Sequence, residues 1–319
     1  MSTWLAPCGA AAALIAAFIM PTVAAGEVLK VCLDEDLPPL SAHHRGKPDS
    51  GFDVALAGAI AEKLGRPLKI QWFESKLDED SSPALEANAL LSDGRCSLVG
   101  SYALTKDSLV VPGVKTAKLP DFDGATTADR RGRRVALGVL TPSVPYLYSP
   151  LTIALGAKAS EKASEKARDR RIAGIGDLAG LRIGIESGTL ADAVLMTFDN
   201  GRLIDHITHL VPGRDDLLGA LDRGDFDATL LDLRRLDAHR AAHPDSKITG
   251  SGYYYPIGIN RGYVGLDSDP ALLAAVNKAL TDLQGSGTVA GLAQTAGLTY
   301  LPPREPAILG DVWLKVLGK

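Results

Sequence analysis

Apolar residues along the chain gather in short runs and in helical stripes, and their order predicts alternating strands and helices. Residues 28–41, VLKVCLDEDLPPLS, begin as a buried strand and end in a run of acids and two prolines. The acids are Asp34, Glu35 and Asp36. They form either a solvated loop or the rim of a working cleft, and the pattern of this segment alone leaves both open.

A helix and a strand follow this first strand. Residues 51–67 show helical periodicity, with Asp53 as a candidate cap and with Gly65 and Pro67 as the stop. The apolar face of this helix consists of Leu56, Ile60 and Leu64. Residues 68–73 alternate as in a strand, a second helix is expected near 83–92, and CSLVGSY is the next strand. This β-α-β-α-β order predicts parallel strands with helices on both faces.

The pattern recurs in the second half of the chain. Residues 181–186 predict a strand, SGT a tight loop, and a helix from Leu190 turns Val194, Leu195 and Phe198 inward. The segments LLSDGRCSLVGSY and ALDRGDFDATLLD then match each other, so that Gly94 corresponds to Gly224, Ser97 to Asp227 and Tyr102 to Asp232. Two similar α/β lobes explain the match most simply, although a chance match over so few residues is the alternative.

Two extended stretches predict crossings between the lobes, at 144–157 and 252–262. The stretch KASEKASEKARDRR after the first has a helical, solvated charge pattern, and residues 269–298 predict a helix pair. The expected organisation is then a signal peptide at 1–25, a first lobe at 26–150 with an insertion at 109–134, a second lobe at 151–255, and a return to the first lobe at 256–319.

Composition excludes some classes of function. The 319-residue chain is 46% hydrophobic and 23% charged, which is typical of a soluble globular protein. A net charge of −4 with dispersed lysines and arginines argues against nucleic acid as a partner, and 5% aromatic residues argue against a base-stacking surface.

The N-terminus predicts export. The first 25 residues carry no charge, and an apolar stretch from Ala10 to Met20 precedes Pro21 and the small residues TVAAG. This pattern is typical of a secretory signal cleaved near Ala25, although no Lys or Arg precedes the apolar stretch. An uncleaved membrane anchor is the alternative, and the apolar stretch is short for a span of about 20 residues.

Cleavage would leave two cysteines, Cys32 and Cys96, each in a short strand-like run. In an oxidising compartment this pair suggests one disulfide between adjacent parallel strands, and two separate buried thiols are the alternative. No histidine lies at metal-ligand spacing from either cysteine.

Four of the histidines are the candidate residues for an enzymatic role. His43 and His44 follow the rim acids, and His206 and His209 at i and i+3 could share a helix face. No nucleophile, base and orienting group assemble from the sequence, and no H-E-x-x-H motif occurs. We therefore expect no enzymatic activity, no catalytic residue, no metal site and no cofactor.

Six segments in order resemble the family 3 extracytoplasmic solute-binding proteins of ABC importers. They are LKVCLDEDLPPLS, GFDVALAGAIAEKLG, VPYLY, IGDLAGLRIGIESGTLADA, LDRGDFDATLLD and VNKALTDLQGSGTVAGLAQTAGL, and they cover most of 28–298. The resemblance implies a type II periplasmic-binding-protein fold, with two α/β lobes, each a mainly parallel sheet with helices on both faces, and two hinge crossovers. It also implies a periplasmic monomer that traps a small polar solute, amino-acid-like or a carboxylate, and delivers it to an inner-membrane permease.

Ligands of open α/β sheets bind beyond the carboxyl ends of the strands, which places Asp36 at the cleft rim. In ESGTLADA, free N–H groups and the hydroxyls of Ser187 and Thr189, on either side of Gly188, could hold an anion. An ordinary helix cap is the alternative there. By the resemblance, Asp232 matches the carboxylate that receives the ligand's ammonium group, and a surface acid is its alternative.

The first lobe departs from the family pattern. Leu40 stands where the family has an aromatic residue, and the Thr-x-x-Arg motif is reduced to Thr105 followed by Ser108. The missing arginine, which would grip a ligand carboxylate, points to a ligand other than an α-amino acid. Arg134, or alternatively Arg133, is the candidate to return to the site after the insertion. The remaining predicted ligand-binding residues of this lobe are Tyr102 and Tyr146.

The positions of Cys32 and Cys96 resemble a subgroup that accompanies periplasmic quinoprotein alcohol dehydrogenases, although that subgroup often has an acid where this chain has Ser97. This resemblance implies an alternative role, as an accessory protein that binds such a dehydrogenase or its pyrroloquinoline quinone. A lyase or dehydratase on the same fold is a further alternative.

Overall fold

The computed structural model describes residues 1, 27–75, 81–110, 113–130, 133–157 and 172–310. The predicted signal peptide and the charged stretch 158–171 lie outside these ranges, apart from Met1. The helices are α1 (Phe52–Leu64), α2 (Pro83–Ser92), α3 (Lys106–Leu109), α4 (Thr127–Arg130), α6 (Leu190–Thr197), α7 (Leu217–Arg223), α8 (Leu233–Ala242), α9 (Pro270–Gly285) and α10 (Thr288–Thr295). Short 3-10 helices are η1 (Ile175–Leu178), η2 (Phe198–Gly201) and η3 (Ile204–His206).

The strands are β1 (Leu29–Asp34), β2 (Asp36–Leu37), β3 (Ser41–Ala42), β4 (Leu68–Glu74), β5 (Leu98–Ala103), β6 (Thr116–Lys118), β7 (Asp121–Phe122), β8 (Arg134–Ala136), β9 (Leu140–Pro142), β10 (Leu147–Leu155), β11 (Ile183–Glu186), β12 (Ile207–Leu210), β13 (Ala228–Asp232) and β14 (Thr249–Leu266). The strands predicted from alternation and from apolar runs are all present, with ends shifted by a few residues.

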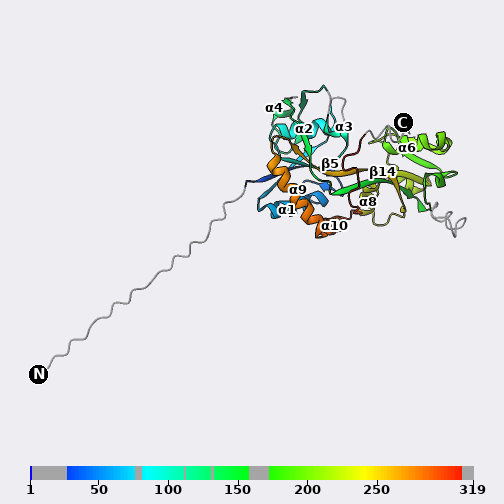
Figure 1. Cartoon of the computed structure of the whole chain (residues 1–319). Coiled ribbons are helices and arrows are strands. Elements are labelled where there is room, and N and C mark those ends of the chain that lie inside the picture. Colours follow the sequence, from blue (N-terminus) through cyan, green and yellow to red (C-terminus); the bar gives the residue numbers. More distant parts are fainter. Residues whose placement is uncertain (2–26, 76–80, 111–112, 131–132, 158–171, 311–319) are drawn as a thin grey trace.

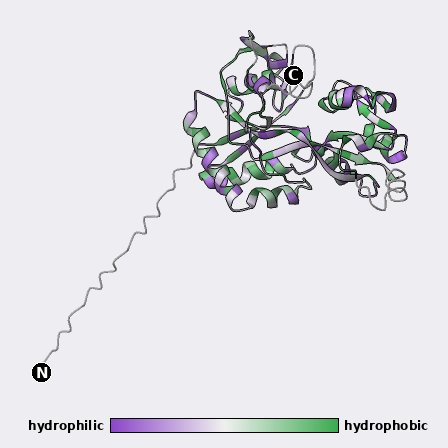
Figure 2. Cartoon of the chain, turned by 45° about the vertical axis from the view of Figure 1, so that its right-hand side comes forward, coloured by the Kyte–Doolittle hydropathy of each residue, from purple (hydrophilic) through white to green (hydrophobic). Residues whose placement is uncertain are grey.

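Two α/β lobes are joined by two long strands (Figures 1 and 2). In the first lobe β4, β1 and β5 are parallel, and in the second β12, β11 and β13 are parallel. The predicted crossovers are β10 and β14, which pair antiparallel with each other and also with β13 and β5. The parallel strands of both lobes and the two crossovers therefore belong to one continuous sheet, in the order β12-β11-β13-β10-β14-β5-β1-β4-β7, while β9 pairs with β14 off this path and β2-β3 and β6-β8 form separate two-stranded sheets. The predicted α/β class is confirmed.

The internal match seen in the sequence corresponds to the same local structure in both lobes. Gly94 and Gly224 end α2 and α7 with φ of +71° and +78°, which glycine adopts without strain. The next residue in each copy donates its N–H to the carbonyl four residues before the glycine, at 3.0 Å in both. Each copy then enters a strand parallel to the first strand of its lobe.

Each lobe has its own hydrophobic core beneath its helices. The first-lobe core packs α1, α9 and α10 against β1 and includes Val31, Leu56, Ile60, Tyr146, Tyr263, Val276 and Leu280. The second-lobe core packs α6 against β11 and β13 and includes Ile153, Ile183, Val194, Leu195 and Leu230. Figure 2 shows helices with both hydrophobic and hydrophilic residues, as expected where one side of a helix covers a sheet.

Asp53 does not cap α1, contrary to the expectation. Gly51 is the N-cap residue, and no side chain caps the helix. Asp53 lies one residue inside α1, is fully buried, and accepts hydrogen bonds from Ser101 and Tyr146. Helix periodicity located the helix correctly but could not reveal partners 48 and 93 residues away.

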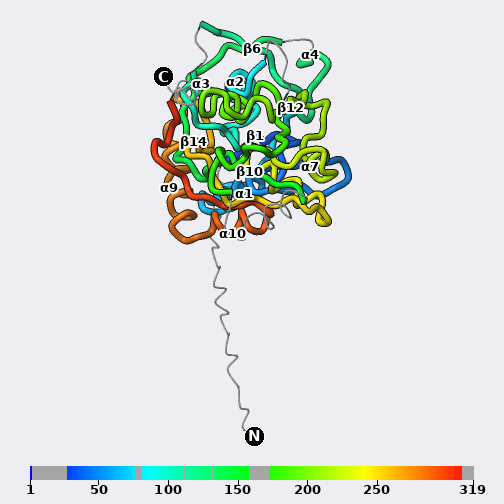
Figure 3. The backbone as a smooth tube through the Cα atoms, turned by 90° about the vertical axis from the view of Figure 1, so that its right-hand side faces the viewer, coloured from blue at the N-terminus to red at the C-terminus, as the bar shows by residue number. Residues whose placement is uncertain are grey.

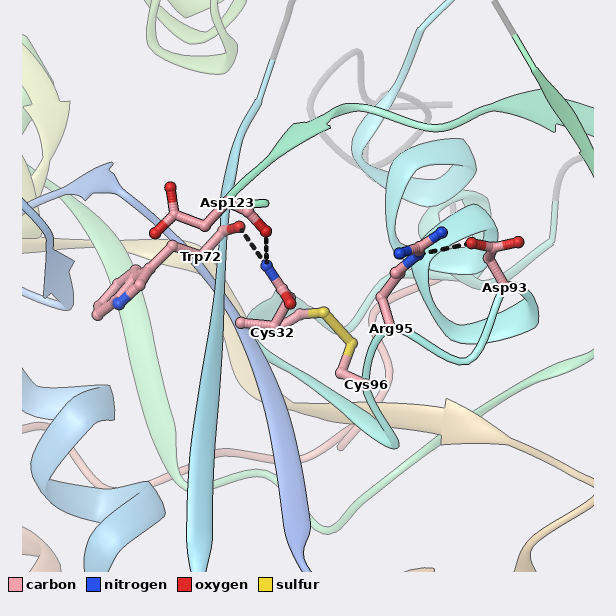
Figure 4. The surroundings of a disulfide bond; sticks show 7 residues. Cys32, Trp72, Asp93, Arg95, Cys96 and Asp123 are labelled. Atoms are coloured by element: carbon pink, nitrogen blue, oxygen red, sulfur yellow. Dashed lines mark hydrogen bonds and ion pairs between the residues drawn. A yellow bond between two sulfur atoms is a disulfide. The ribbon is translucent and has the colours of Figure 1, made fainter. Parts of the chain in front are cut away.

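Cys32 and Cys96 form a disulfide, as predicted (Figure 4). Cys32 lies within β1 and Cys96 two residues before β5, and their Cα atoms are 5.6 Å apart. Both cysteines are buried. The bond joins the two strands at the centre of the first lobe.

The described part of the insertion packs on the first lobe. Its strand β6 pairs with β8, which begins at the last residue of the insertion, and its strand β7 pairs with β4. Phe122 of β7 is 6% exposed, and the guanidinium carbon of Arg95 lies 4.5 Å from its ring centroid. The insertion therefore extends the first lobe.

Residues 299–309, which we call the C-terminal strap, cross both hinge strands after α10. The strap begins beside α8, where Thr299 donates two hydrogen bonds to Asp237 at 2.7 and 2.9 Å. It continues along β10, where Tyr148 N donates to Leu301 O, and ends beside α3 (Figure 3). Within the described residues, no helix is long and apolar enough to span a membrane.

Candidate functional site

A pocket of about 190 Å³ lies where the hinge strands meet the second lobe. Its walls come from β10, β14, the ends of β11 and β13, and the starts of α6, α7 and α8. Two predicted site residues, Thr189 and Asp232, line it. The apolar part of the wall consists of Leu151, Ile185, Leu190, Ala191, Leu217, Leu230, Leu231, Ile257 and Ile259. Polar side chains in the wall are Ser149, Glu186, Thr189, Asp232 and Arg235.

The loop before α6 partly satisfies its own N–H groups. Thr189 is the N-cap residue, and its hydroxyl accepts from Asp192 N at 3.1 Å and donates to Glu186 O at 2.9 Å. Gly188 N donates to the Asp192 carboxylate, and Ser187 N donates to Leu210 O, both at 2.9 Å. The predicted anion site is therefore reduced to the first-turn N–H groups of α6, which have no partner within the helix.

Asp232 ends β13 and caps α8. Its Oδ1 accepts from Arg234 N at 2.9 Å, which fixes the start of the helix. Its Oδ2 lies 3.6 Å from Nη2 of Arg261. The carboxylate predicted to receive a ligand's ammonium group therefore already faces a guanidinium of this chain.

Arg261 is a residue of the site that sequence reasoning missed. It stands on β14, is 13% exposed at its side chain, and donates from Nε to Ser149 Oγ at 3.1 Å and from Nη1 to Ser101 O at 2.8 Å. It thus joins β5, β10 and β13 at the hinge. The available signal was its isolation, because Arg261 is the only charged residue in the crossover GYYYPIGINRG.

Glu186 and Arg235 form a second ion pair in the pocket wall. Both Nη atoms of Arg235 donate to the Glu186 carboxylate, one of them at 2.7 Å, in the two-point arrangement typical of strong Arg–carboxylate pairs. Hydrogen bonding to Glu186 raises the pKa of Arg235. Glu186 is 7% exposed, so this pair neutralises a carboxylate held largely away from water.

Arg234 lies beside this pair and contacts the other lobe. Its Nη1 donates to Pro38 O at 3.2 Å, across the seam between α8 and the turn that joins β2 to β3. Its Nε is buried and has no hydrogen-bond partner within the described parts of the chain. Burial lowers the pKa of Arg234, and the charges of Arg261 and Arg235 lower it further. Three guanidiniums therefore gather at the joint of the lobes.

The arrangement of strands and helices in this chain is similar to that in several solved structures. The L-cystine solute receptor of Neisseria gonorrhoeae, in an unliganded open conformation, is 17% identical, with a TM-score of 0.58 over 87% of this chain and 96% of that one. The fold is that of two-lobed solute-binding proteins. No protein-family model and no curated protein sequence matches the chain.

Two further structures are of the same kind. Substrate binding domain 2 of Lactococcus lactis GlnP, in an open conformation, is 19% identical, with a TM-score of 0.55 over 84% of this chain and 94% of that one. The second substrate binding domain of a Streptococcus pneumoniae protein assigned as an amino acid ABC transporter is 16% identical, with a TM-score of 0.56 over 84% and 99%. At these identities the likeness concerns the fold alone.

The structure does not bring the predicted first-lobe residues to the pocket wall. Tyr102 is buried, and its hydroxyl donates to Ser108 O. Thr105 caps α3 in a reciprocal pair with Ser108, the residue in place of the family's arginine. Tyr146 is fully buried beside Asp53. These side chains serve the first-lobe core and its turns, and their role as ligand contacts stays a prediction.

Asp36 and Arg134 also lie outside the pocket wall. Asp36 is exposed on β2, and its N–H donates to Asp34 Oδ1 at 2.9 Å. Arg134 is exposed on β8, and its guanidinium donates within its own two-stranded sheet, from Nε to Thr116 Oγ1 and from Nη2 to Thr116 O. Its position shows no return toward the hinge, so Arg261 and not Arg134 is the arginine that reaches Asp232.

The histidines do not assemble a catalytic group. His43 binds Asp49 at 2.6 Å and stacks on Trp72, and the Asp49 hydrogen bond raises the pKa of His43. His206 and His209 do not share a helix, contrary to the expectation, because His206 ends η3 and His209 lies in β12. Among the described residues, no group of three or more His, Cys, Asp or Glu could hold a metal ion.

Asp53 is the most perturbed carboxylate near the hinge. Burial raises its pKa to about 6, although hydrogen bonds from Ser101 and Tyr146 and the charge of Arg261 oppose the shift. Ser101 connects this carboxylate to the pocket, since its hydroxyl bonds Asp53 while its carbonyl oxygen accepts from Arg261. Ser101 holds a φ of +55°, a conformation that residues other than glycine seldom adopt.

Proposed function

We propose that this protein is an extracytoplasmic receptor that binds a small solute in the hinge pocket and delivers it to an ABC permease. The observation that carries the proposal is the convergence of Arg261, Asp232 and Arg235 at the joint of two lobes. The same fold serves the L-cystine solute receptor. The compared structures are named as binding proteins, which supports binding over catalysis.

A solute in this pocket would act by joining the lobes. The wall combines hinge strands with the starts of α6 and α8, all outside the first lobe, so a solute seated there would favour closure through the additional contacts that the first lobe makes when it moves onto the solute. A ligand that makes more contacts in the closed conformation than in the open one shifts the equilibrium toward the closed conformation. Arg234 and Pro38 cross the seam at its edge and could hold the closed form.

The disulfide supports an extracytoplasmic location, because such bonds persist in oxidising compartments. Delivery to a permease and a monomeric state belong to the same proposal. The alternative role, beside a quinoprotein dehydrogenase or with pyrroloquinoline quinone, stays a prediction.

A ligand screen tests the proposal. Melting temperature is measured with amino acids, carboxylates, polyamines and pyrroloquinoline quinone, and each compound that raises it is titrated by calorimetry. A ligand that binds only the folded form stabilises it, by an amount that rises with the logarithm of the ratio of ligand concentration to Kd. A binder among the small solutes is expected, whereas the absence of any binder would contradict the receptor role.

A pocket-filling variant localises the binding. Ile257→Trp places a large side chain in the pocket wall, and Ile204→Trp is the matched control on exposed η3. We expect the first to weaken solute binding by about tenfold or more and the second to leave it unchanged. Equal affinities for both variants would place the solute elsewhere.

A further inference from the structure

Both carboxylates in the pocket wall are engaged by arginines of this chain. Glu186 is held at two points by Arg235, and Asp232 faces Nη2 of Arg261. An ammonium group entering the pocket would need a carboxylate of its own, since a buried unpaired charge is costly. Within the described pocket wall, no third carboxylate is present.

The Arg261 guanidinium occupies the space beside the Asp232 carboxylate. It donates to Ser101 O at 2.8 Å, is anchored by Ser149 Oγ at 3.1 Å, and lies 3.6 Å from Asp232 Oδ2. A ligand ammonium next to Asp232 would have to displace this anchored side chain or accept a like charge beside it. Like charges held close together oppose binding.

Donors for an anion remain in the same pocket. An arginine has five N–H groups, and Arg235 uses two of them on Glu186, which leaves three. Leu190 and Ala191 line the pocket at the first turn of α6, where backbone N–H groups have no partner within the helix. Arg234, next to Arg235 but outside the pocket wall, has a buried Nε with no hydrogen-bond partner among the described residues. The rest of the wall is mainly aliphatic.

We propose that the solute is an aliphatic carboxylate without an amino group, such as a 2-oxo or 2-hydroxy acid. Its carboxylate binds Arg235 and the start of α6, and its carbon chain packs against the aliphatic wall. Arg261 determines this preference by occupying the ammonium position beside Asp232. The inference rests on the proposed receptor function and names the chemical class of its solute.

Matched ligands test the preference in the wild-type protein. Calorimetry compares L-leucine with 2-hydroxy-4-methylpentanoate, 4-methyl-2-oxopentanoate and 4-methylpentanoate, and a second series uses the valine skeleton. We expect the acids without an amino group to bind at least about tenfold more tightly than the amino acid. An amino acid that binds as tightly as its matched acids would overturn this inference and leave the receptor role standing.

The outcomes of the wider screen separate the two proposals. A polyamine or an α-amino acid as the tightest binder would contradict the solute class while supporting a receptor. No binder in any class would contradict the receptor role, and this inference with it.

An arginine variant tests the reason for the preference. Arg261→Gln removes the charge beside Asp232. It should reduce the ratio of the affinity for the matched acids to the affinity for L-leucine by about tenfold. The control is Arg202→Gln, which replaces an exposed arginine that pairs with Asp199. It should leave this affinity ratio unchanged. The melting temperature of each variant confirms folding. An unchanged affinity ratio in folded Arg261→Gln protein would show that Arg261 does not determine the preference for acids without an amino group.

Discussion

At the scale of single residues, the buried carboxylate of Asp53 has the clearest consequence. Its partners come from β5 and from the segment before β10, so they meet only once the first lobe has folded. In the unfolded chain the same side chain is hydrated and has an ordinary pKa of 3.8. Burial favours its protonated form, and the folded protein holds this proton up to a pH of about 6.

This shift predicts a pH dependence of stability. Between pH 4 and 6 the folded state binds more protons at Asp53 than the unfolded state does, so the free energy of unfolding falls as pH rises through this window. A shift of roughly two pH units corresponds to roughly 3 kcal/mol. The free energy of unfolding, measured in urea from pH 4 to pH 7, should therefore decline less for Asp53→Asn than for the wild type.

The control for this measurement is Asp267→Asn at an exposed position. It should follow the wild-type pH dependence. If the free energy of unfolding depended on pH in the same way for Asp53→Asn and the wild type, Asp53 would titrate in the folded protein as it does in the unfolded chain.

At the scale of elements, the disulfide ties β1 to the start of β5. The bond closes a loop of 64 residues, and a constraint of this length on the unfolded chain corresponds to about 4 kcal/mol. Replacing Cys32 and Cys96 together by alanine should lower the free energy of unfolding by up to that amount, measured in urea. The reductant dithiothreitol should destabilise the wild type and leave the double variant unchanged. Equal stability of both proteins without reductant would contradict the prediction.

The side chain of Asn260 bonds the C-terminal strap to the hinge at several points. Asn260 Nδ2 lies within 3.2 Å of the carbonyl oxygens of Arg304, Pro306 and Ala307, and its Oδ1 accepts from Arg304 N. Asn260 is 3% exposed, so its removal would leave buried polar groups without partners.

We expect Asn260→Ala to lower the free energy of unfolding by roughly 2 to 3 kcal/mol. Hydrogen exchange should also rise within residues 299–309, because the strap loses its main contact with β14. The exposed Gln294→Ala on α10 is the control. A destabilisation of Asn260→Ala no larger than that of the control would mean that the strap adds little to the hinge.

At the scale of the whole molecule, local patterns in the sequence predicted the architecture. Alternation, helix stops and the Gly94–Gly224 match are properties of short segments, and they identified the lobes, both crossovers and the helix pair α9–α10. The two predicted strand runs that carry cysteines also proved to be bonded.

The site was harder to predict, because its contacts join distant segments. Thr189 and Asp232 were found from loops at strand ends, but the pairing of Asp232 with Arg261 depends on how β14 crosses the hinge. The contact between Arg234 and Pro38 spans 196 residues and has no local pattern. The missing arginine at Ser108 suggested an unusual ligand, and only the fold revealed which arginine lies beside Asp232.

The most direct test is a crystal structure of the protein with the tightest binder from the screen. The account predicts the solute in the hinge pocket, in contact with Arg235 and the start of α6, with Arg261 still beside Asp232. A solute bound outside the wall that contains Thr189, Asp232 and Arg235 would contradict the central claim.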